Sequence, residues 1–290
     1  MNKVLTIPEG KIDVVIDTDA FADSIWEMDD QYAIAYLLTF DKFNVKAFYT
    51  YMAGDEFVRG VSEVVNRCGR KDLNSVIFRG CTKGTDVNDP EKSEAALDLI
   101  ERSKNYSKEN PLYVIAIGPV TNIADALLID PTLEERIVLV ALFGHDFKQP
   151  ITDEYNLVKD MVASKVIMET NVPIMLVPCI DVAKKLVMSY NECVEQWQGK
   201  NDIGDYLIYC MGLMCKEEYR PNLKRVIWDA VPVALLSHPE WVTYEITERP
   251  WLTFDKHWLF GKNDGKILYV SDINSEAIKK DIFERIKNYE

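Results

Sequence analysis

The chain has 290 residues, of which 48% are hydrophobic, and its 47 acidic and 33 basic side chains give a formal net charge of −14 at pH 7. This length and apolar content allow one large α/β domain or two small ones, and they exclude an intrinsically disordered chain and a small disulfide scaffold. The excess of acid argues against nucleic acid as a main partner, because binding a polyanion needs a dense basic surface and the sequence has none.

Short apolar runs alternate along the chain with longer segments of helical period, which is typical of a mostly parallel sheet wrapped by helices. The runs are nearly continuous in Val, Ile and Leu, as in strands that are buried on both faces. The predicted strands are residues 12–17, 45–51, 75–79, 112–117, 137–143 and 172–178. The predicted helices are residues 29–39, 56–68, 91–103, 120–128, 159–170, 191–198, 203–218, 229–237 and 275–288.

The remaining segment, residues 241–272, is predicted to form extended pieces with a hairpin turn at Lys262-Asn263-Asp264-Gly265, because Asp-Gly favours a tight turn. The sequence contains no internal repeat, low-complexity tract or linker. We therefore expect a single α/β domain over residues 1–290, built on a Rossmann-like open sheet.

The N-terminus and the cysteines both bear on the compartment. Residues 1–10 lack the features of a secretory signal, and no apolar run approaches the roughly 18–20 residues that span a bilayer. We therefore expect a soluble cytoplasmic protein without a membrane partner. The cysteines form no C-x-x-C pair, and we expect free thiols that are buried or half-buried in a reducing compartment. They are Cys68, Cys81, Cys179, Cys193, Cys210 and Cys215.

Five aspartates, Asp17, Asp19, Asp23, Asp29 and Asp30, lie within fourteen residues directly after the first predicted strand. In doubly wound sheets the ligand site lies beyond the carboxyl ends of the strands. Crowded carboxylates repel one another unless a cation neutralises them, and an all-oxygen ligand set favours Ca²⁺ or Mg²⁺ over zinc. The pattern alone leaves open a solvated acidic loop in which Asp29 is a helix N-cap.

The run from Asp17 to Ala35 resembles the D-x-D … D-D signature of the calcium-dependent nucleoside hydrolases of the inosine–uridine-preferring superfamily. Further matches follow in the family's order, so that the resemblance covers about four fifths of the chain. They are the segment 115–124 (Ile-Ala-Ile-Gly-Pro-Val-Thr-Asn-Ile-Ala), Asp130-Pro131, Leu142-Phe143-Gly144, Glu154-Tyr155-Asn156, residues 172–178 before Asp181-Val182, and Trp228-Asp229-Ala230-Val231. Each match is weak alone, and their common order makes the resemblance specific.

The resemblance implies hydrolysis of the N-glycosidic bond of a ribonucleoside to ribose and free base, with a Ca²⁺-bound water as the nucleophile. It implies that Asp19 is both a metal ligand and the general base that deprotonates this water. Asp30 and Asp229 would be further carboxylate ligands, and Ile117 would supply its backbone carbonyl. Asp17 would orient the loop without touching the metal.

The resemblance also assigns residues to the substrate. Asp29, Glu154 and Asn156 would hold the ribose hydroxyls, and Asp55 stands where the family usually has a ribose-binding Asn. Trp228 occupies the position at which purine-preferring members stack an indole on the base, so we expect a purine preference. His145 remains a candidate polar contact or acid, although a loop histidine is more often structural or solvated.

The sequence departs from the family pattern in two segments besides Asp55. Inserted residues 23–26 stretch the acidic motif, and an ungapped alignment would place Asp23 and Ser24 where the gapped one places Asp29 and Asp30. The stretch expected before Glu154 is shortened to residues 146–150, where Lys148 could favour an anionic or modified substituent. These departures indicate a divergent member.

Two other functions remain open at this point. One is a catalytically silent protein of the same fold that binds a sugar or nucleoside, or acts on an altered substrate. The other is a Mg²⁺-dependent hydrolase built on a strand-end aspartate pair, although the Lys and the further acidic pair of such enzymes cannot be placed here. The family resemblance also implies a homo-oligomer, either a dimer or a tetramer.

Overall fold

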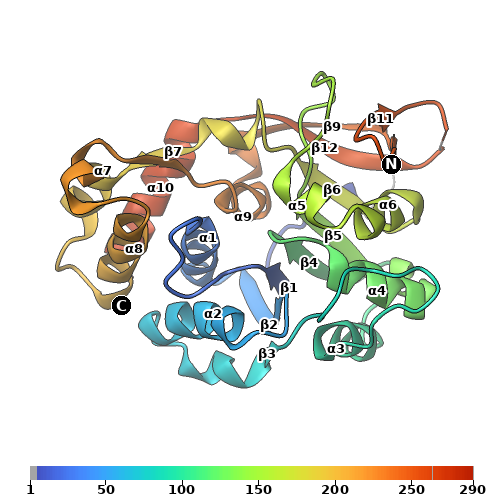
Figure 1. Cartoon of the computed structure of the whole chain (residues 1–290), viewed down its shortest axis with the longest axis horizontal. Coiled ribbons are helices and arrows are strands. Elements are labelled where there is room, and N and C mark those ends of the chain that lie inside the picture. Colours follow the sequence, from blue (N-terminus) through green and yellow to red (C-terminus); the bar gives the residue numbers. More distant parts are fainter. Residues whose placement is uncertain (1–4, 263, 290) are drawn as a thin grey trace.

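The computed structural model describes residues 5–262 and 264–289. Over these residues the chain forms an eight-stranded sheet in the order β3-β2-β1-β4-β5-β6-β12-β9 (Figure 1). Neighbouring strands are parallel except for the antiparallel pair β12 and β9 at one edge. The strands are β1 (Ile12–Thr18), β2 (Phe43–Thr50), β3 (Ile77–Phe78), β4 (Leu112–Ala116), β5 (Ile137–Leu142), β6 (Ile174–Val177), β9 (Val242–Glu248) and β12 (Lys266–Ile273).

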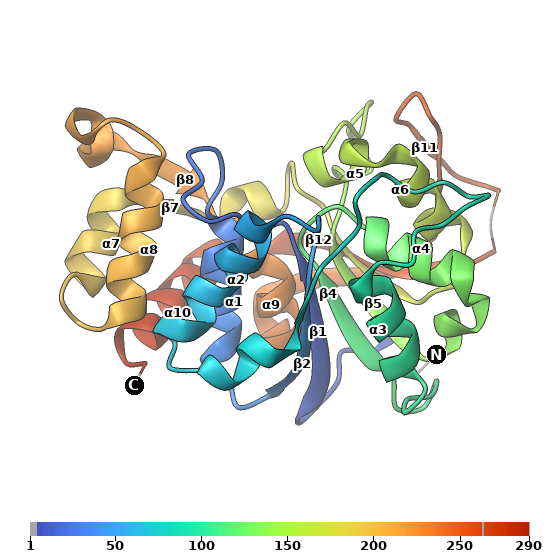
Figure 2. The ribbon, with the colours of Figure 1, turned by 60° about the horizontal axis from the view of Figure 1, so that its bottom comes forward.

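Helices cover both faces of the sheet, which confirms the predicted α/β architecture (Figure 2). Alternate residues of β1 separate two apolar cores: Val14 and Ile16 pack toward one, and Val15 packs toward the other. The helices are α1 (Asp29–Leu38), α2 (Asp55–Arg67), α3 (Glu94–Ser103), α4 (Thr121–Ile129), α5 (Tyr155–Lys159), α6 (Met161–Glu169), α7 (Tyr190–Trp197), α8 (Asp202–Leu213), α9 (Ala230–Ser237) and α10 (Ser275–Lys287). Side chains of α1, α2 and α9 contribute to the first core, and those of α3, α4 and α6 to the second.

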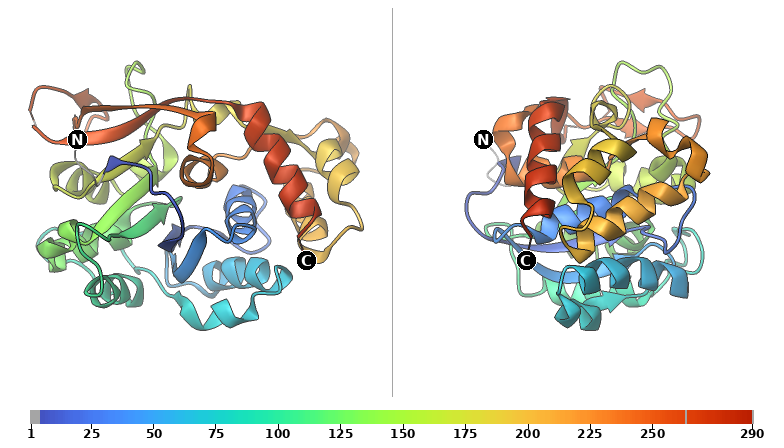
Figure 3. Two further views of the ribbon diagram at one scale, coloured as in Figure 1. Left: turned by 180° about the vertical axis from the view of Figure 1, so that it is seen from behind. Right: turned by 90° about the vertical axis from the view of Figure 1, so that its left-hand side faces the viewer.

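The segment between β6 and α9 extends the fold beyond the sheet. Helices α7, α8 and α10 pack against one another at one end of the molecule (Figure 3). Strands β7 (Val187–Ser189) and β8 (Lys224–Val226) form a separate antiparallel pair, which the sequence analysis did not predict. This pair leads directly into residues 227–229, and it therefore positions Trp228 and Asp229 ahead of α9.

Local side-chain caps explain where the predicted boundaries differ from the structure. The predicted helix 159–170 divides at Asp160, whose carboxylate accepts a hydrogen bond from the amide of Ala163 at 3.0 Å and begins α6. The predicted helix 91–103 begins only at Glu94, because the Ser93 hydroxyl caps it. The predicted helix 203–218 ends at Leu213, and a 3₁₀ helix (Glu217–Asn222) follows.

The antiparallel pair β9 and β12 agrees with the predicted extended segment near the C-terminus. Between them lies a small hairpin of β10 (Trp251–Leu252) and β11 (Trp258–Leu259). The predicted turn at 262–265 includes Asn263, which lies outside the described residues. Within the described ranges, no helix is long and apolar enough to cross a membrane. All six cysteines are free, with five buried and Cys215 half-buried, as predicted.

Candidate active site

The candidate site lies beyond the carboxyl ends of β1 and β4, where the order of the sheet reverses. Strand β1 has β2 on one side and β4 on the other, so the loops that leave β1 and β4 diverge and open a crevice. The Ile117 amide donates a 2.9 Å hydrogen bond to the Asp17 carbonyl, which joins the two strand ends. At Gly118 a Cβ would lie 2.8 Å from the backbone nitrogen of Asp19, so only glycine permits this approach.

A cavity of about 390 Å³ occupies this crevice. It is strongly acidic, because six carboxylates line it against one arginine. Its wall combines residues from the ends of β1, β4, β5 and β6, from the start of α1, and from the segment between β8 and α9. The lining residues are Asp19, Trp26, Glu27, Asp29, Asp30, Ile117, Leu142, His145, Glu154, Tyr155, Asn156, Cys179, Ile180, Arg225, Trp228 and Asp229.

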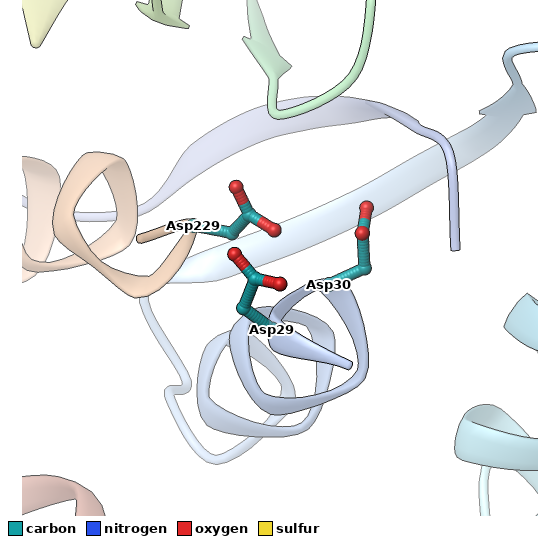
Figure 4. A group of neighbouring side chains, drawn as sticks. All are labelled: Asp29, Asp30 and Asp229. Atoms are coloured by element: carbon teal, nitrogen blue, oxygen red, sulfur yellow. The ribbon is translucent and has the colours of Figure 1, made fainter. Parts of the chain in front are cut away.

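Three of these carboxylates converge closely enough to share one ion. One oxygen from each of Asp29, Asp30 and Asp229 lies within 4.8 Å of the other two (Figure 4). Asp29 and Asp30 open α1, and Asp229 immediately precedes α9, which packs against α1. The packing of α1 on α9 thus brings Asp29 and Asp30 close to Asp229, which lies about 200 residues later in the sequence.

Burial, and then repulsion between neighbours, raises the pKa of Asp19, Asp30 and Asp229 well above the usual range. Burial also raises the pKa of Asp29. In the absence of a cation these groups coexist only by retaining protons. A hard divalent cation would remove that repulsion, and the donor set of carboxylates and the Ile117 carbonyl consists of oxygen alone. The residues present therefore fit Ca²⁺ or Mg²⁺.

Asp19 lines the same cavity but is not one of the three convergent carboxylates. It is 5% exposed, and the nearby charges of Asp30, Glu27 and Asp29 add to the burial that raises its pKa. The Thr18 hydroxyl between Asp17 and Asp19 donates to the Asp30 carboxylate and fixes that side chain. The end of β1 thereby holds Asp19 directly and Asp30 through the Thr18 hydroxyl.

Asp17 lies behind the cavity and is completely buried. Its carboxylate accepts a 3.0 Å hydrogen bond from the Asn122 amide, and burial raises its pKa to about 7. The same Asn122 amide donates to the Thr50 carbonyl at 2.9 Å. Asp17 thus connects the ends of β1, β2 and α4 without reaching the cavity.

The remaining predicted ligands are held by local hydrogen bonds. Glu154 caps α5, because its carboxylate accepts from the amides of Asn156 at 2.8 Å, Leu157 at 2.9 Å and Gly144 at 3.1 Å. The Asn156 side-chain amide donates to the Ile117 carbonyl at 3.0 Å. Trp228 is half-buried in the cavity wall. Glu154, Asn156, Ile117 and Trp228 thus line the same cavity as the acidic group.

Two aspartates discussed above lie outside the cavity. The Asp55 side chain is 87% exposed and forms a 2.6 Å ion pair with Arg79. Asp23 pairs with Arg59 at 3.2 Å and accepts a hydrogen bond from the Tyr209 hydroxyl at 3.0 Å. The structure therefore places Asp29 and Asp30, rather than Asp23, at the cavity, which supports the gapped alignment.

Sequence reasoning did not assign several residues of the cavity wall. Trp26 is the last of the inserted residues and Glu27 follows it, and Arg225 donates to the Trp26 carbonyl at 3.1 Å. Tyr155 and Cys179 also line the wall. Tyr155 lies inside the matched Glu-Tyr-Asn element, so that match was a usable signal. Arg225 lies on β8, one strand of the pair that was not predicted, and nothing in the sequence pattern pointed to it.

Comparisons with known proteins identify a family and several similar structures. The profile of the family described as inosine-uridine preferring nucleoside hydrolase matches residues 14–263. A plant nucleoside hydrolase superposes with a TM-score of 0.78 at 18% identity, over 96% of this chain and 99% of the other. A purine-preferring ribonucleoside hydrolase from Gardnerella vaginalis gives 0.77 at 19% identity, over 96% and 98%. An inosine-guanosine nucleoside hydrolase gives 0.76 at 18%, over 96% and 99%.

At these identities the superpositions show a common fold. The family profile carries the assignment further, because it spans most of the chain and includes every residue that lines the cavity. The chain therefore belongs to the inosine-uridine preferring nucleoside hydrolase family and is a nucleoside hydrolase.

Proposed function

We propose that this enzyme hydrolyses the N-glycosidic bond of ribonucleosides with a preference for purines, and that it uses Ca²⁺ at the cavity beyond β1 and β4. The family is metal-dependent. The observation that carries the proposal is the convergence of the Asp29, Asp30 and Asp229 carboxylates within 4.8 Å, in the cavity that Asp19 and Trp228 also line.

We assign the metal to the carboxylates of Asp19, Asp30 and Asp229 and to the Ile117 carbonyl, with Asp29 within reach of the same position. When bound, Ca²⁺ would act as a Lewis acid that holds the attacking water and ribose hydroxyls and lowers the pKa of that water. At present the Ile117 carbonyl accepts from the Asn156 amide. Occupation of that carbonyl by a metal would release the amide to bind a ribose hydroxyl.

Asp19 is the proposed general base. Its carboxylate takes a proton from the attacking water, whose oxygen forms a bond to C1′ of the ribose as the bond from C1′ to the base nitrogen breaks. The electron pair of the broken bond leaves with the base. Positive charge develops on the sugar ring during this step, and the surrounding carboxylates stabilise it electrostatically. Asp29 and Glu154 are proposed to bind the ribose by accepting hydrogen bonds from its hydroxyls.

The purine preference rests on Trp228 and on the exposed Trp26, which line the same cavity. A flat indole offers a purine more stacking area than it offers a pyrimidine. Two of the similar structures are a purine-preferring and an inosine-guanosine enzyme, which supports this proposal. A contact from Asp55 to the substrate would require its ion pair with Arg79 to open.

We also propose that the enzyme works in the cytoplasm as a homo-oligomer. Six free cysteines support a reducing compartment. Tyr244 and Ile246 on the edge strand β9, together with Trp251 and Phe254 beside it, are exposed large apolar side chains that support association between copies. Sedimentation of the purified protein tests the second point, since a monomer at micromolar concentration would contradict it.

The test of the function is hydrolysis of inosine with Ca²⁺ by the wild type, by Asp19→Asn and by the control Asp23→Asn. Loss of a general base lowers kcat by about 10²–10⁴-fold. We expect that loss only in Asp19→Asn, with ribose affinity retained, because Asp23 lies outside the cavity. An unchanged rate in Asp19→Asn contradicts the base assignment.

The same assay separates the alternative functions. If the wild type binds ribose but does not hydrolyse inosine, the protein is a catalytically silent binding protein. If it is active with Mg²⁺ and inactive with Ca²⁺, it is a Mg²⁺-dependent hydrolase.

A further inference from the structure

His145 is the histidine of the cavity wall. The chain has three histidines, and of these only His145 lines the cavity. It follows Gly144 at the end of β5 and is 8% exposed. It shares the wall with Ile180 and Trp228, the residue to which we assign the base.

The main chain at His145 is held from several sides. Its amide donates to the Thr152 hydroxyl at 2.8 Å, and its carbonyl accepts from the Trp258 indole at 3.3 Å. Gly144 has φ +68°, and a Cβ there would lie 2.6 Å from the Trp258 ring, so glycine is required before the histidine. These contacts fix the position from which the imidazole extends.

The imidazole ring itself is held only weakly. Its Nδ1 is buried and has no partner of hydrogen-bond geometry among the described residues. Its Nε2 lies 3.5 Å from the carboxylate of Asp153, which is longer than a hydrogen bond. A histidine with a purely structural role usually has its ring nitrogens paired, because an unpaired buried nitrogen destabilises the fold. The main chain is therefore fixed, Nε2 is turned toward Asp153, and Nδ1 is the ring nitrogen that no described protein group occupies.

The charges around the ring favour a proton on it. The carboxylates of Asp153 and Asp181 face it from the segment before α5 and the loop after β6, and both raise the pKa of His145, as does the Gly144 carbonyl. Burial outweighs them and lowers that pKa. The neighbouring Asp146 carboxylate accepts from the Tyr269 hydroxyl at 2.8 Å, and Glu154 is engaged with three backbone amides.

We propose that His145 is the acid that protonates the departing base, with Asp153 as its positioning residue. This rests on the proposed function and adds the group that donates the proton to which the base nitrogen binds through the leaving electron pair. The Nδ1 proton of the imidazolium passes to a ring nitrogen of the purine as the C1′–N bond breaks, while Nε2 stays turned toward Asp153. The base leaves neutral, and the imidazole regains its proton from solvent after release of the products.

The test compares a leaving group that needs a proton with one that does not. Inosine releases a poor leaving group, whereas p-nitrophenyl riboside releases a stable phenolate. We expect His145→Gln to lower kcat for inosine by about 10²-fold or more and to leave kcat for p-nitrophenyl riboside within about 3-fold. The matched control is His257→Gln. His257 also faces an aspartate, Asp255 at 3.4 Å, but it is 49% exposed and lies outside the cavity.

The pH profile tests the role of Asp153. An acid must be protonated to act, so kcat for inosine falls as pH rises through the pKa of His145. Asp153→Asn removes a carboxylate that raises this pKa, and we expect the basic limb to move to lower pH. An unmoved limb would overturn the positioning role.

Equal losses of His145→Gln on both substrates, or no loss on either, would overturn the acid assignment while leaving the proposed function intact. A wild type that hydrolyses neither substrate in Ca²⁺ would overturn both.

Discussion

Replacing Asp229 by asparagine should stabilise the metal-free protein and abolish its stabilisation by Ca²⁺. Two unit charges 4.8 Å apart, the limit for the Asp29, Asp30 and Asp229 oxygens, repel by roughly 3.5 kcal/mol at an effective dielectric constant of 20. The carboxyls avoid this repulsion by retaining protons, so the repulsion sets the upper limit of the cost that the isosteric, uncharged amide removes. A gain of about 3 kcal/mol in a chain of 290 residues corresponds to a rise in Tm of roughly 5 °C.

The sign of the pH dependence follows from the raised pKa of Asp229. Its carboxyl keeps its proton in the folded state at a pH where the unfolded chain has already lost it, so the metal-free protein loses stability as pH rises above the unfolded pKa of about 4. The gain from Asp229→Asn should therefore be small at pH 4 and large at pH 8.

Thermal unfolding at several pH values, with EGTA or with Ca²⁺, measures both effects. Asp23→Asn is the control, because Asp23 is exposed, paired with Arg59 and outside the cavity. We expect a higher Tm for Asp229→Asn than for wild type in EGTA and the reverse order in Ca²⁺. The reasoning fails if Asp229→Asn lowers Tm in EGTA at pH 8, or if Ca²⁺ raises its Tm as much as that of the wild type.

Two further predictions concern residues on either side of this group. Trp228→Leu should raise KM for inosine by about 3–10-fold through loss of stacking and should change KM for uridine less. Steady-state kinetics with the two nucleosides measure both changes, and equal changes in the two KM values would contradict the stacking role. Burial raises the pKa of Asp17 to about 7, so Asp17→Asn should stabilise the metal-free protein by an amount that grows from pH 4 to pH 7 and reaches on the order of 3–4 kcal/mol. Denaturant unfolding in EGTA measures this gain. A loss of stability at pH 7 would show that the lost Asn122 contact outweighs the relief of burial.

Much of the site could be predicted because the sheet itself assembles it. Asp19 and Ile117 each follow a buried parallel strand, and β1 and β4 are neighbours at the point where the strand order reverses. The apolar run of β1 therefore pointed to the aspartates that follow it, whereas only the family resemblance pointed to Ile117 and Asp229. Asp229 reaches the group through the packing of α9 on α1.

The parts that were not predicted depend on tertiary contacts or on short elements. Strand β8 has only three residues, too few for a periodic signal, yet it places Arg225 on the cavity wall. Asp55 lies exposed at the start of α2 and pairs with Arg79, which is 24 residues later in the chain. Trp26 belongs to an insertion, for which the family pattern offers no guide.

The central claim is that the carboxylates after β1 and at the start of α1 bind Ca²⁺, and that this ion binds the sugar of the substrate. A crystal structure of the protein soaked with Ca²⁺ and ribose tests it most directly. We predict an ion bound by Asp19, Asp30, Asp229 and the Ile117 carbonyl, with ribose hydroxyls on the same ion and the Asn156 amide turned from Ile117 toward the sugar. Ribose in the cavity without an ion between these carboxylates would contradict the claim.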